Sequence, residues 1–343
     1  MGHVRRCLAL ASALSGLGIR VCFAMNEVPR ETLQVVREAG YRAEAIPASP
    51  QGADFTRNGF DRMQTEEVAR KHGARGVLID HYGATTDYFQ ALRGSERKVA
   101  VIDDLGDRDF HAVDWLLNQN LGQPAHPYRV RPDCIQLLGP AYALLRPEFA
   151  LARQFLSRAF TPQDRKVLIT LGGGETTFLG CQVVDALNLV SRQLEIRWVL
   201  GMSDGLPPRF LRSLNRSRHV IQILRNVNQM AEQMLWADLA INAGGSTCWE
   251  LSCLGVPMIV LVTSPDQRLN AAALEREECA WNLGEWSDRA SGEKLVTAVE
   301  TLLQDPQRET MSFRARTRVD GQGAIRVAQS LRELSEQPRG GGR

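Results

Sequence analysis

Short apolar segments rich in β-branched residues alternate with segments of helical periodicity along most of the chain. The first series ends near residue 120 and comprises IRVCFA, AEAIP, GVLID, KVAVID and DWLLNQN. The second series begins near residue 166 and comprises KVLITL, IRWVLG, HVIQIL, DLAINA and PMIVLV. Strands separated by helices in this way predict parallel sheets covered by helices. We therefore expect an α/β protein with two doubly wound, Rossmann-like domains that face a central cleft.

The strand pattern stops between the two series. Residues 138–165 hold three prolines and a basic helical stretch, and we place the domain boundary near residues 155–163. The predicted domains are residues 1–155 and residues 164–325. Residues 326–343 are expected to form the end of a terminal helix and a tail, and EQPRGGGR has a composition typical of disorder.

The amino-acid composition argues against several kinds of binding partner. Among 343 residues, 41 are basic and 39 are acidic, and no long block carries one sign, so nothing predicts binding to nucleic acid or stable membrane insertion. The seven cysteines are widely spaced without a CxxC pair, which is typical of reduced thiols in the cytoplasm and not of a zinc site. The longest apolar run, residues 254–263, is about half of the ~20 residues that a membrane span needs.

The first helix is predicted from residue 3 to a stop signal at Gly18. Its apolar stripe comprises Val4, Cys7, Leu8, Ala11, Leu14 and Leu17, and the basic VRR stretch is expected to be a solvated face. His3 stands at the N-terminal end of this helix, where the helix dipole favours a neutral imidazole that can act as a general base. The alternative is a chance Gly-His pair beside Met1.

Two glycine-rich turns follow predicted strands in the second series. In LITLGGGETT, residues 168–177, Gly172 and Gly173 allow backbone amides to approach a phosphate or a sugar. The motif is neither a Walker loop nor GxGxxG, and a tight turn without a ligand is the alternative.

The second turn, within residues 238–262, is more informative. A strand ends at Asn242, Gly244 and Gly245 form the turn, and Ser246 or Thr247 caps a helix whose first amides can hold a diphosphate without a metal. Glu250 lies one helical turn further on, where its carboxylate can reach a ribose diol. The alternative for Glu250 is a capping box with Thr247, and the two roles are compatible.

Polar residues also follow two strands of the first series. Asp80, His81 and Tyr82 follow one strand, and Asp103 and Asp104 follow the next. At the carboxyl ends of parallel strands such residues point towards a ligand cleft. Adjacent residues on a strand point to opposite faces, so we expect one structural and one cleft-facing aspartate and no metal.

Seven motifs in order carry a family resemblance: GHVRRCLALASAL, LIDHY, VIDDL, LLNQN, LLGPAYALLRPEF, LITLGGGE and INAGGSTCWELSCLGVP. Between residue 2 and about residue 285 the chain resembles the UDP-sugar hydrolases of pseudaminic acid biosynthesis (PseG type). These are relatives of the MurG-like glycosyltransferases with the GT-B fold. The chain is also similar to related spore-coat polysaccharide proteins.

The resemblance implies metal-independent hydrolysis of UDP-2,4-diacetamido-2,4,6-trideoxy-β-L-altropyranose to the free sugar and UDP, without a cofactor. It places the catalytic histidine at His3 in the first domain and UDP binding in the second. The diphosphate loop falls on Gly245, Ser246 and Thr247, the ribose-binding glutamate on Glu250 and the sugar-side tyrosine on Tyr82. The full set of candidate substrate-binding residues is Gly2, Asp80, Tyr82, Gly172, Gly173, Met230, Gly245, Ser246, Thr247, Glu250, Asp266 and Gln267.

The sequence departs from the family pattern at two positions near the expected sugar pocket. Asp266 and Gln267 stand where many members have an Asn-Gln pair, and Glu175 stands where aspartate is commoner. The identity of the sugar therefore stays open. Two other functions also stay open: a GT-B glycosyltransferase that uses a UDP-sugar donor, and a sugar-nucleotide binding protein without catalysis.

In the resembling family, the Gly-His pair follows a first strand and a glycine-rich turn. That strand lies in the middle of a doubly wound sheet, where its loss would leave backbone groups of both neighbours unpaired. We therefore expect the natural reading frame to extend upstream of Met1 by about 10 to 20 residues, enough for one strand and a turn.

Overall fold

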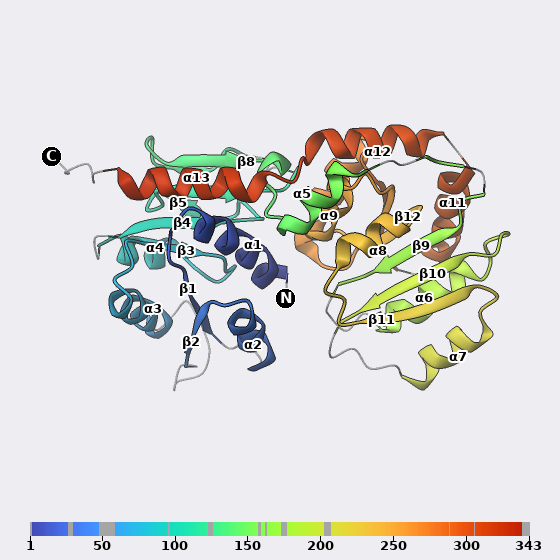
Figure 1. The fold of residues 1–343 in the computed structure, drawn as a ribbon, viewed down its shortest axis with the longest axis horizontal. Helices are drawn as coiled ribbons and strands as arrows, with labels where there is room; N and C mark the ends of the chain where they lie inside the picture. The colour runs from blue at the N-terminus through green and yellow to red at the C-terminus, as the bar shows by residue number, and fades with distance from the viewer. Residues whose placement is uncertain are drawn as a thin grey trace. The chain divides into compact units, whose positions relative to one another are not determined.

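The structure is a computed structural model of the chain, and it divides into two compact units (Figure 1). Unit 1 comprises Met1–Arg146 and Gln322–Arg343, and unit 2 comprises Pro147–Gly321. The residues that the structure describes are 2–26, 30–47, 59–94, 97–122, 126–156, 159–161, 163–172, 177–201, 207–287, 289–304 and 306–337.

Unit 1 contains parallel strands in three separate sheets. β1 (Cys22–Asn26) pairs with β2 (Arg42–Ile46). A four-stranded sheet has the order β3 (Gly76–Ile79), β4 (Lys98–Ile102), β6 (Trp115–Asn118), β8 (Ile135–Leu138). β5 (Asp109–Phe110) pairs with β7 (Arg129–Val130). Among the described residues, β1 and β3 therefore each have a strand partner on one side only. The upstream strand expected from the sequence stays a prediction.

The helices of unit 1 are α1 (Gly2–Gly16), α2 (Arg30–Glu38), α3 (Phe60–Lys71), α4 (Thr86–Gly94) and α13 (Gly323–Glu336), with a 3-10 turn η1 (Pro140–Tyr142). α13, red in Figure 1, lies along α1. The Trp115 indole donates a hydrogen bond to Ser330 Oγ on α13 at 3.0 Å. Leu10 of α1 and Val327 of α13 share a fully buried apolar cluster with strands β4 and β6, which fixes α1 against the sheet.

Unit 2 contains one parallel sheet of six strands. Its order is β11 (Val220–Arg225), β10 (Glu195–Leu200), β9 (Lys166–Thr170), β12 (Leu239–Ala243), β13 (Met258–Val262), β14 (Trp281–Glu285). In chain order this is 3-2-1-4-5-6, the doubly wound arrangement, with the switch point between β9 and β12. Ligands of such sheets bind at the carboxyl ends of the strands beside that point.

The helices of unit 2 are α5 (Pro147–Gln154), α6 (Thr177–Leu187), α7 (Pro208–Arg216), α8 (Met230–Trp236), α9 (Thr247–Cys253), α10 (Arg268–Arg276), α11 (Arg289–Gln304) and α12 (Gln307–Arg318), with a 3-10 turn η2 (Pro265–Gln267). A large apolar core lies between sheet and helices, and Trp198 and Phe210 meet edge to face within it at 5.2 Å.

All ten predicted strands are present within a few residues of their expected positions. The structure adds four strands: the short pair β5 and β7, and β8 and β14 at sheet edges. Residues in β8 alternate between exposed and half-buried, and β14 carries a glycine with positive φ at Gly284, so neither reads as a continuous apolar run.

The compact units correct the predicted domain limits in two places. The division falls at Arg146 and Pro147, earlier than the predicted 155–163, because α5 buries Phe149 and packs against α8 and α9 of unit 2. Residues from Gln322 onwards belong to unit 1, whereas the sequence assigned residues up to 325 to the second domain. The apolar face of α13 finds its partner in α1, which no local pattern indicates.

Candidate functional site

A buried arginine joins the carboxyl ends of β3 and β4 in unit 1. Arg6 on α1 is 5% exposed, so the expected solvated VRR face is wrong at this position. Its Nε and Nη2 donate to the two carboxylate oxygens of Asp80 at 2.8 and 2.5 Å, and its Nη1 donates to Asp104 at 3.0 Å. The pair with Asp80 is bidentate, the strongest geometry for an arginine and a carboxylate. One guanidinium therefore holds two carboxylates from neighbouring strands.

The contacts around Arg6 determine the ionisation of Asp80 and Cys7. Burial by itself would raise the pKa of Asp80, but the charge of Arg6 and its hydrogen bonds outweigh burial and lower that pKa. Burial, followed by the nearby Asp80 charge, raises the pKa of the Cys7 thiol well above its usual range. The thiol therefore stays protonated, and it donates to Asp80 Oδ2 at 3.3 Å.

His3 and Tyr82 lie beside this ion group. His3 Nδ1 is 3.8 Å from Asp80 Oδ1, and the histidine side chain is 40% exposed. Its ring meets the Tyr82 ring edge to face, with centroids 5.0 Å apart. The Tyr82 hydroxyl donates to Asp104 Oδ2 at 3.0 Å. The structure thus brings together three of the predicted site residues of unit 1, namely His3, Asp80 and Tyr82.

The two adjacent aspartates after β4 have separate surroundings, as expected from strand geometry. Asp103 is fully buried and accepts hydrogen bonds from the amides of Leu105 and Gly106, from Arg108 and from the Tyr128 hydroxyl. These bonds make Asp103 the structural anchor of the following loop. Asp104 accepts from Arg6, Tyr82 and also Asn120 Nδ2, at 2.9 Å.

A second polar group lies at the ends of β1 and β3. Asp61 at the start of α3 accepts hydrogen bonds from Asn26 Nδ2 and from the Tyr88 hydroxyl, both at 2.8 Å. Burial raises the pKa of Asp61 and lowers that of His81. His81 Nδ1 accepts a hydrogen bond from the Gly83 amide at 2.9 Å, so the neutral ring carries its proton on Nε2. No local pattern in the sequence indicates a role for Asn26 or Asp61.

The predicted diphosphate loop of unit 2 follows β12 at the switch point of the sheet. Within the described part of the chain, the backbone amides of Gly245, Ser246 and Thr247 donate no hydrogen bond to another protein group. Ser246 occupies the N-cap position of α9, as predicted, but its hydroxyl makes no capping hydrogen bond. Three successive amides without a protein acceptor leave donors available to an anion.

A glutamine and an asparagine support this loop. Gln267 Oε1 accepts from the Gly244 amide at 3.1 Å and from the Thr263 amide and hydroxyl at 3.0 and 3.2 Å. Asn270 Nδ2 donates to the Gly244 carbonyl at 3.2 Å. A Cβ atom on Gly244 would lie 3.0 Å from Gln267 Cβ, so the close approach favours glycine. Gln267 is thus a brace of the loop, a role that sequence reasoning missed.

The remaining candidates are dispersed over both units. Gly172 follows β9 with a φ of +91°, a conformation that favours glycine, while Gly173 and Glu175 lie outside the described residues. Met230 begins α8 and is 5% exposed. Glu250 is half-buried on α9, Asp266 is half-buried in η2 and Gly2 is exposed at the start of α1. Their predicted roles in substrate binding stay predictions.

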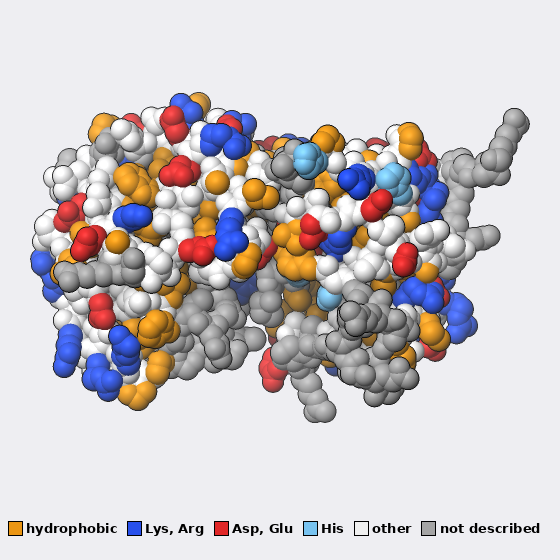
Figure 2. Space-filling view, turned by 180° about the vertical axis from the view of Figure 1, so that it is seen from behind, with side chains coloured by type: hydrophobic (Ala, Val, Ile, Leu, Met, Phe, Trp, Pro, Cys, Tyr) orange, Lys and Arg blue, Asp and Glu red, His pale blue; other side chains and the backbone are white. Residues whose placement is uncertain are grey.

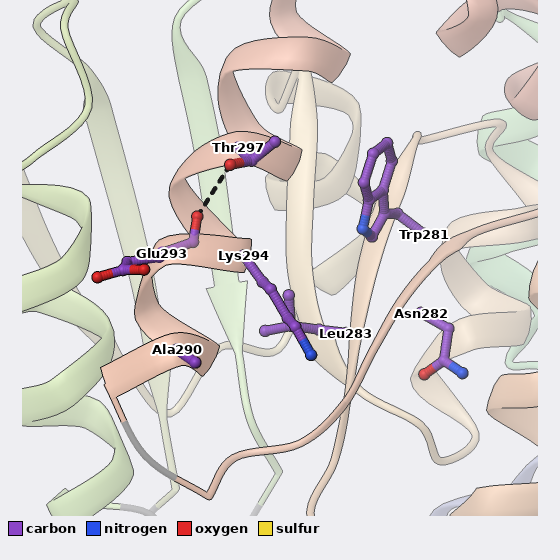
Figure 3. Close-up of a pocket in the computed structure, with 7 residues that line it drawn as sticks. All are labelled: Trp281, Asn282, Leu283, Ala290, Glu293, Lys294 and Thr297. Carbon is purple, nitrogen blue, oxygen red and sulfur yellow. Dashed lines mark hydrogen bonds between the residues drawn. The ribbon is translucent and has the colours of Figure 1, made fainter.

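Other surface features lie away from these candidates. A depression of about 500 Å³ on unit 2 is lined by β14 and α11, including Trp281, Lys294 and Thr297 (Figure 3). None of the predicted site residues lines it. The face seen in Figure 2 carries acidic and basic side chains interspersed over its described part.

The described residues contain neither a cluster suited to a metal ion nor a helix suited to span a membrane. No group of three or more His, Cys, Asp and Glu side chains there is placed to hold a metal ion. No helix within those ranges is long and apolar enough to span a membrane.

Comparison with known proteins relates unit 2 to sugar-transferring enzymes. Residues 167–325 match the glycosyltransferase family 28 C-terminal domain. The spore coat polysaccharide biosynthesis protein SpsG of Bacillus subtilis is 26% identical over 76% of this chain and 77% of its own length. The uncharacterized protein MJ1062 of Methanocaldococcus jannaschii is 26% identical over 78% of this chain, which spans 54% of that protein.

A bifunctional protein of Helicobacter pylori is also similar. It is named pseudaminic acid cytidylyltransferase and UDP-2,4-diacetamido-2,4,6-trideoxy-beta-L-altropyranose hydrolase. The identity is 21% over 80% of this chain, which spans 44% of that protein. The chain thus covers about half of the length of two of these three relatives.

Solved structures share the fold over nearly the whole chain. MurG of Acinetobacter baumannii superposes with a TM-score of 0.68 at 18% identity, covering 97% of this chain and 96% of that one. The spinosyn rhamnosyltransferase SpnG complexed with thymidine diphosphate gives 0.64 at 18% identity, covering 98% and 97%. The chain therefore has the GT-B glycosyltransferase-like fold, which confirms the predicted fold class of two doubly wound α/β domains.

Proposed function

We propose that this protein hydrolyses a UDP-linked 2,4-diacetamido-2,4,6-trideoxy sugar to the free sugar and UDP, as a step of pseudaminic-type glycan biosynthesis. The observation that carries the proposal is the half-exposed His3 imidazole beside the buried, ionised Asp80 in unit 1. A histidine next to a fixed carboxylate is suited to take a proton from water. The similarity to the H. pylori hydrolase supports this choice of substrate.

In the proposed reaction, water attacks the anomeric carbon of the sugar. His3 accepts the proton of that water, the bond between the anomeric carbon and the β-phosphate oxygen breaks, and UDP leaves with the electron pair. UDP is a stable anion, so the reaction needs charge stabilisation at the diphosphate and no strong general acid. The step needs no metal and no redox cofactor.

Unit 2 would bind the nucleotide. The amides of Gly245, Ser246 and Thr247 offer donors to the diphosphate, at the switch point where nucleotides bind doubly wound sheets. The ribose diol would contact Glu250, one turn into α9. The free thiols of all seven cysteines suit a cytoplasmic setting, where nucleotide sugars are made.

The test is incubation with a panel of UDP-linked diacetamido sugars, with UDP and the free sugar measured by NMR. General-base catalysis is worth about 10²- to 10⁴-fold, so His3→Ala should lose that much turnover and still bind UDP. His111→Ala is the matched control, because His111 is an exposed histidine of unit 1 paired with Asp109. Wild-type turnover in His3→Ala would contradict the assignment of the base.

A glycosyltransferase is the second candidate, because unit 2 matches the glycosyltransferase family 28 C-terminal domain. An acceptor hydroxyl would then replace water as the nucleophile. The two functions differ in their need for an acceptor. UDP release from the sugar nucleotide alone supports the hydrolase, and release only after addition of an acceptor glycan or lipid supports the transferase.

A further inference from the structure

We infer that Asp80 is a positioning residue that fixes the proton of His3 on Nδ1 and leaves Nε2 as the basic nitrogen. This inference deepens the proposed function and rests on it for its catalytic meaning. It also revises the sequence-based expectation, which placed Asp80 among the residues that bind the substrate.

The Asp80 carboxylate is already occupied by protein groups. Both oxygens accept from Arg6, Oδ2 also accepts from the Cys7 thiol, and the side chain is 7% exposed. A substrate hydroxyl or amide would have to displace one of these donors. Displacing a buried charged partner is costly, so Asp80 is better suited to act on a neighbouring side chain than on the substrate.

The neighbouring side chain is His3. Its Nδ1 lies 3.8 Å from Asp80 Oδ1, beyond hydrogen-bond distance by less than 1 Å. Catalytic hydrogen bonds are often long in unliganded enzymes and shorten when the substrate binds. A carboxylate beside Nδ1 favours the tautomer with the proton on that nitrogen, and it stabilises the imidazolium that forms when Nε2 takes a proton from water.

Arg6 extends the same support to Tyr82. Its third donor, Nη1, binds Asp104, and Asp104 accepts the hydroxyl hydrogen bond of Tyr82. Two carboxylates and one guanidinium leave a net charge of −1 beside His3, which favours a developing positive charge there. Arg6 therefore sets the positions of both carboxylates, and each carboxylate acts on one of two rings in mutual contact.

The other charged groups around His3 do not take over this role. Asp80 and His81, which both follow β3, interact with His3 through charge. His81 is held in the opposite tautomer by the Gly83 amide. Across the described residues of α2 and α13, which pack against α1, no charged side chain forms an ion pair with His3.

The competing explanation is that the Arg6–Asp80 ion pair only holds α1 against the sheet. The tautomer of His3 distinguishes this structural role from the positioning role. Nitrogen-15 NMR, recorded at a pH where the histidine rings are neutral, distinguishes Nδ1–H from Nε2–H for each histidine. The expected result in the wild type is Nδ1–H for His3. His81 is an internal reference, because its Nδ1 acceptor role predicts Nε2–H in the same spectrum. Nε2–H at His3 in the wild type would overturn the inference without any variant.

Asp80→Asn is the informative variant. The asparagine keeps the shape but offers an amide N–H to the ring, so His3 should shift towards Nε2–H while His81 stays unchanged. Asp114→Asn is the matched control, since Asp114 is a buried carboxylate of unit 1 that binds the Val99 amide and Arg131, away from His3. If Asp80→Asn leaves the His3 tautomer as in the wild type, the inference is wrong.

Kinetics provides the second readout on the wild type and on Asp80→Asn. We expect kcat to fall about 10- to 100-fold with little change in KM, because an interaction that matters mainly in the transition state is lost. In a His3→Ala background, Asp80→Asn should cause no further loss, since the two residues act as one unit. Additive losses would show that Asp80 acts independently of His3.

The two proposals fail in different ways. If the wild type hydrolyses no UDP-sugar in the panel, the proposed function fails, and the tautomer measurement still decides whether Asp80 orients His3. If the wild type is active but Asp80→Asn retains both its turnover and its His3 tautomer, only the positioning role is wrong.

Discussion

Units 1 and 2 are both parallel α/β layers, but they hold their candidate residues by different forces. In unit 2 the sheet has the order 3-2-1-4-5-6 without interruption, and the predicted loop follows its fourth strand in sequence, β12. In unit 1 the same order is interrupted. β2 and β1 correspond to positions 3 and 2, and β3, β4 and β6 correspond to positions 4, 5 and 6, while no strand of the described residues fills position 1.

The difference extends to the sites. The unit 1 group depends on charge, since Arg6 links Asp80 and Asp104 across two strand ends. The unit 2 loop depends on close approach, since Gly244 leaves room for Gln267 to hold it. Removal of a charge should therefore affect unit 1 most, and addition of a methyl group should affect unit 2 most.

Arg6→Met should have the largest effect on stability. The variant leaves two buried carboxylates without their cation, and breaking a buried ion pair in this way costs about 3 to 5 kcal/mol. Arg5→Met is the control, because Arg5 is exposed on the same helix and its loss should change stability by about 0.5 kcal/mol or less. Urea unfolding followed by far-ultraviolet circular dichroism measures both.

Tryptophan fluorescence shows which unit is affected. Of six tryptophans, only Trp115 belongs to unit 1, so fluorescence reports mainly on unit 2. The Arg6→Met transition should shift more by circular dichroism than by fluorescence. Equal shifts with both probes would indicate that the two units unfold together, and an unchanged transition with both probes would contradict the predicted effect.

Gly244→Ala should have the next largest effect, in unit 2. Its Cβ would lie 3.0 Å from Gln267 Cβ and 3.3 Å from Val260 Cγ1, an overpacking that costs about 1 to 3 kcal/mol. Gly245→Ala is the matched control, since the nearest atom there is 4.0 Å away. The fluorescence-detected transition should move for Gly244→Ala and stay near the wild type for Gly245→Ala. A larger loss at Gly245 would contradict the brace by Gln267.

The sequence predicted local features well and distant pairings poorly. The loop at Gly245 to Thr247 was predictable because strand, turn and helix start are contiguous and each residue type has a local reason. Arg6 was misassigned to a solvated face because its partners lie 74 and 98 residues away, and an arginine beside an apolar stripe normally faces water. The brace at Gln267 spans 23 residues, and the resemblance indicated only a substrate contact there.

The predicted domain boundaries differ from the compact units for the same reason, namely that they depend on contacts between distant segments. α5 and α13 are amphipathic helices whose sequences indicate that they bury one face, but not which sheet supplies the partner surface. Phe149 is buried in unit 2, and Val327 is buried against unit 1. Pairings set by tertiary contacts of this kind lie beyond periodicity, whereas the ten predicted strands are specified by their own apolar runs.

Hydrogen exchange tests the smallest expected effect, the difference between strands paired on both sides in unit 2 and strands paired on one side in unit 1. Amides of β9 and β12 are paired on both sides of each strand, so they should exchange only through large unfolding events. Amides of β1 and β3 that do not face β2 or β4 should exchange at least about tenfold faster, a difference of about 1.4 kcal/mol. Edge strands β8 and β14 are the controls for ordinary one-sided pairing.

Protection of β1 and β3 equal to that of β9 would mean that both edges are covered, and the contrast between a continuous and an interrupted sheet would no longer hold. Exchange like that of β8 and β14 would instead show that the strands delivering Asp80 and Asn26 are ordinary edges, held in place mainly by the side-chain contacts of Arg6 and Asp61.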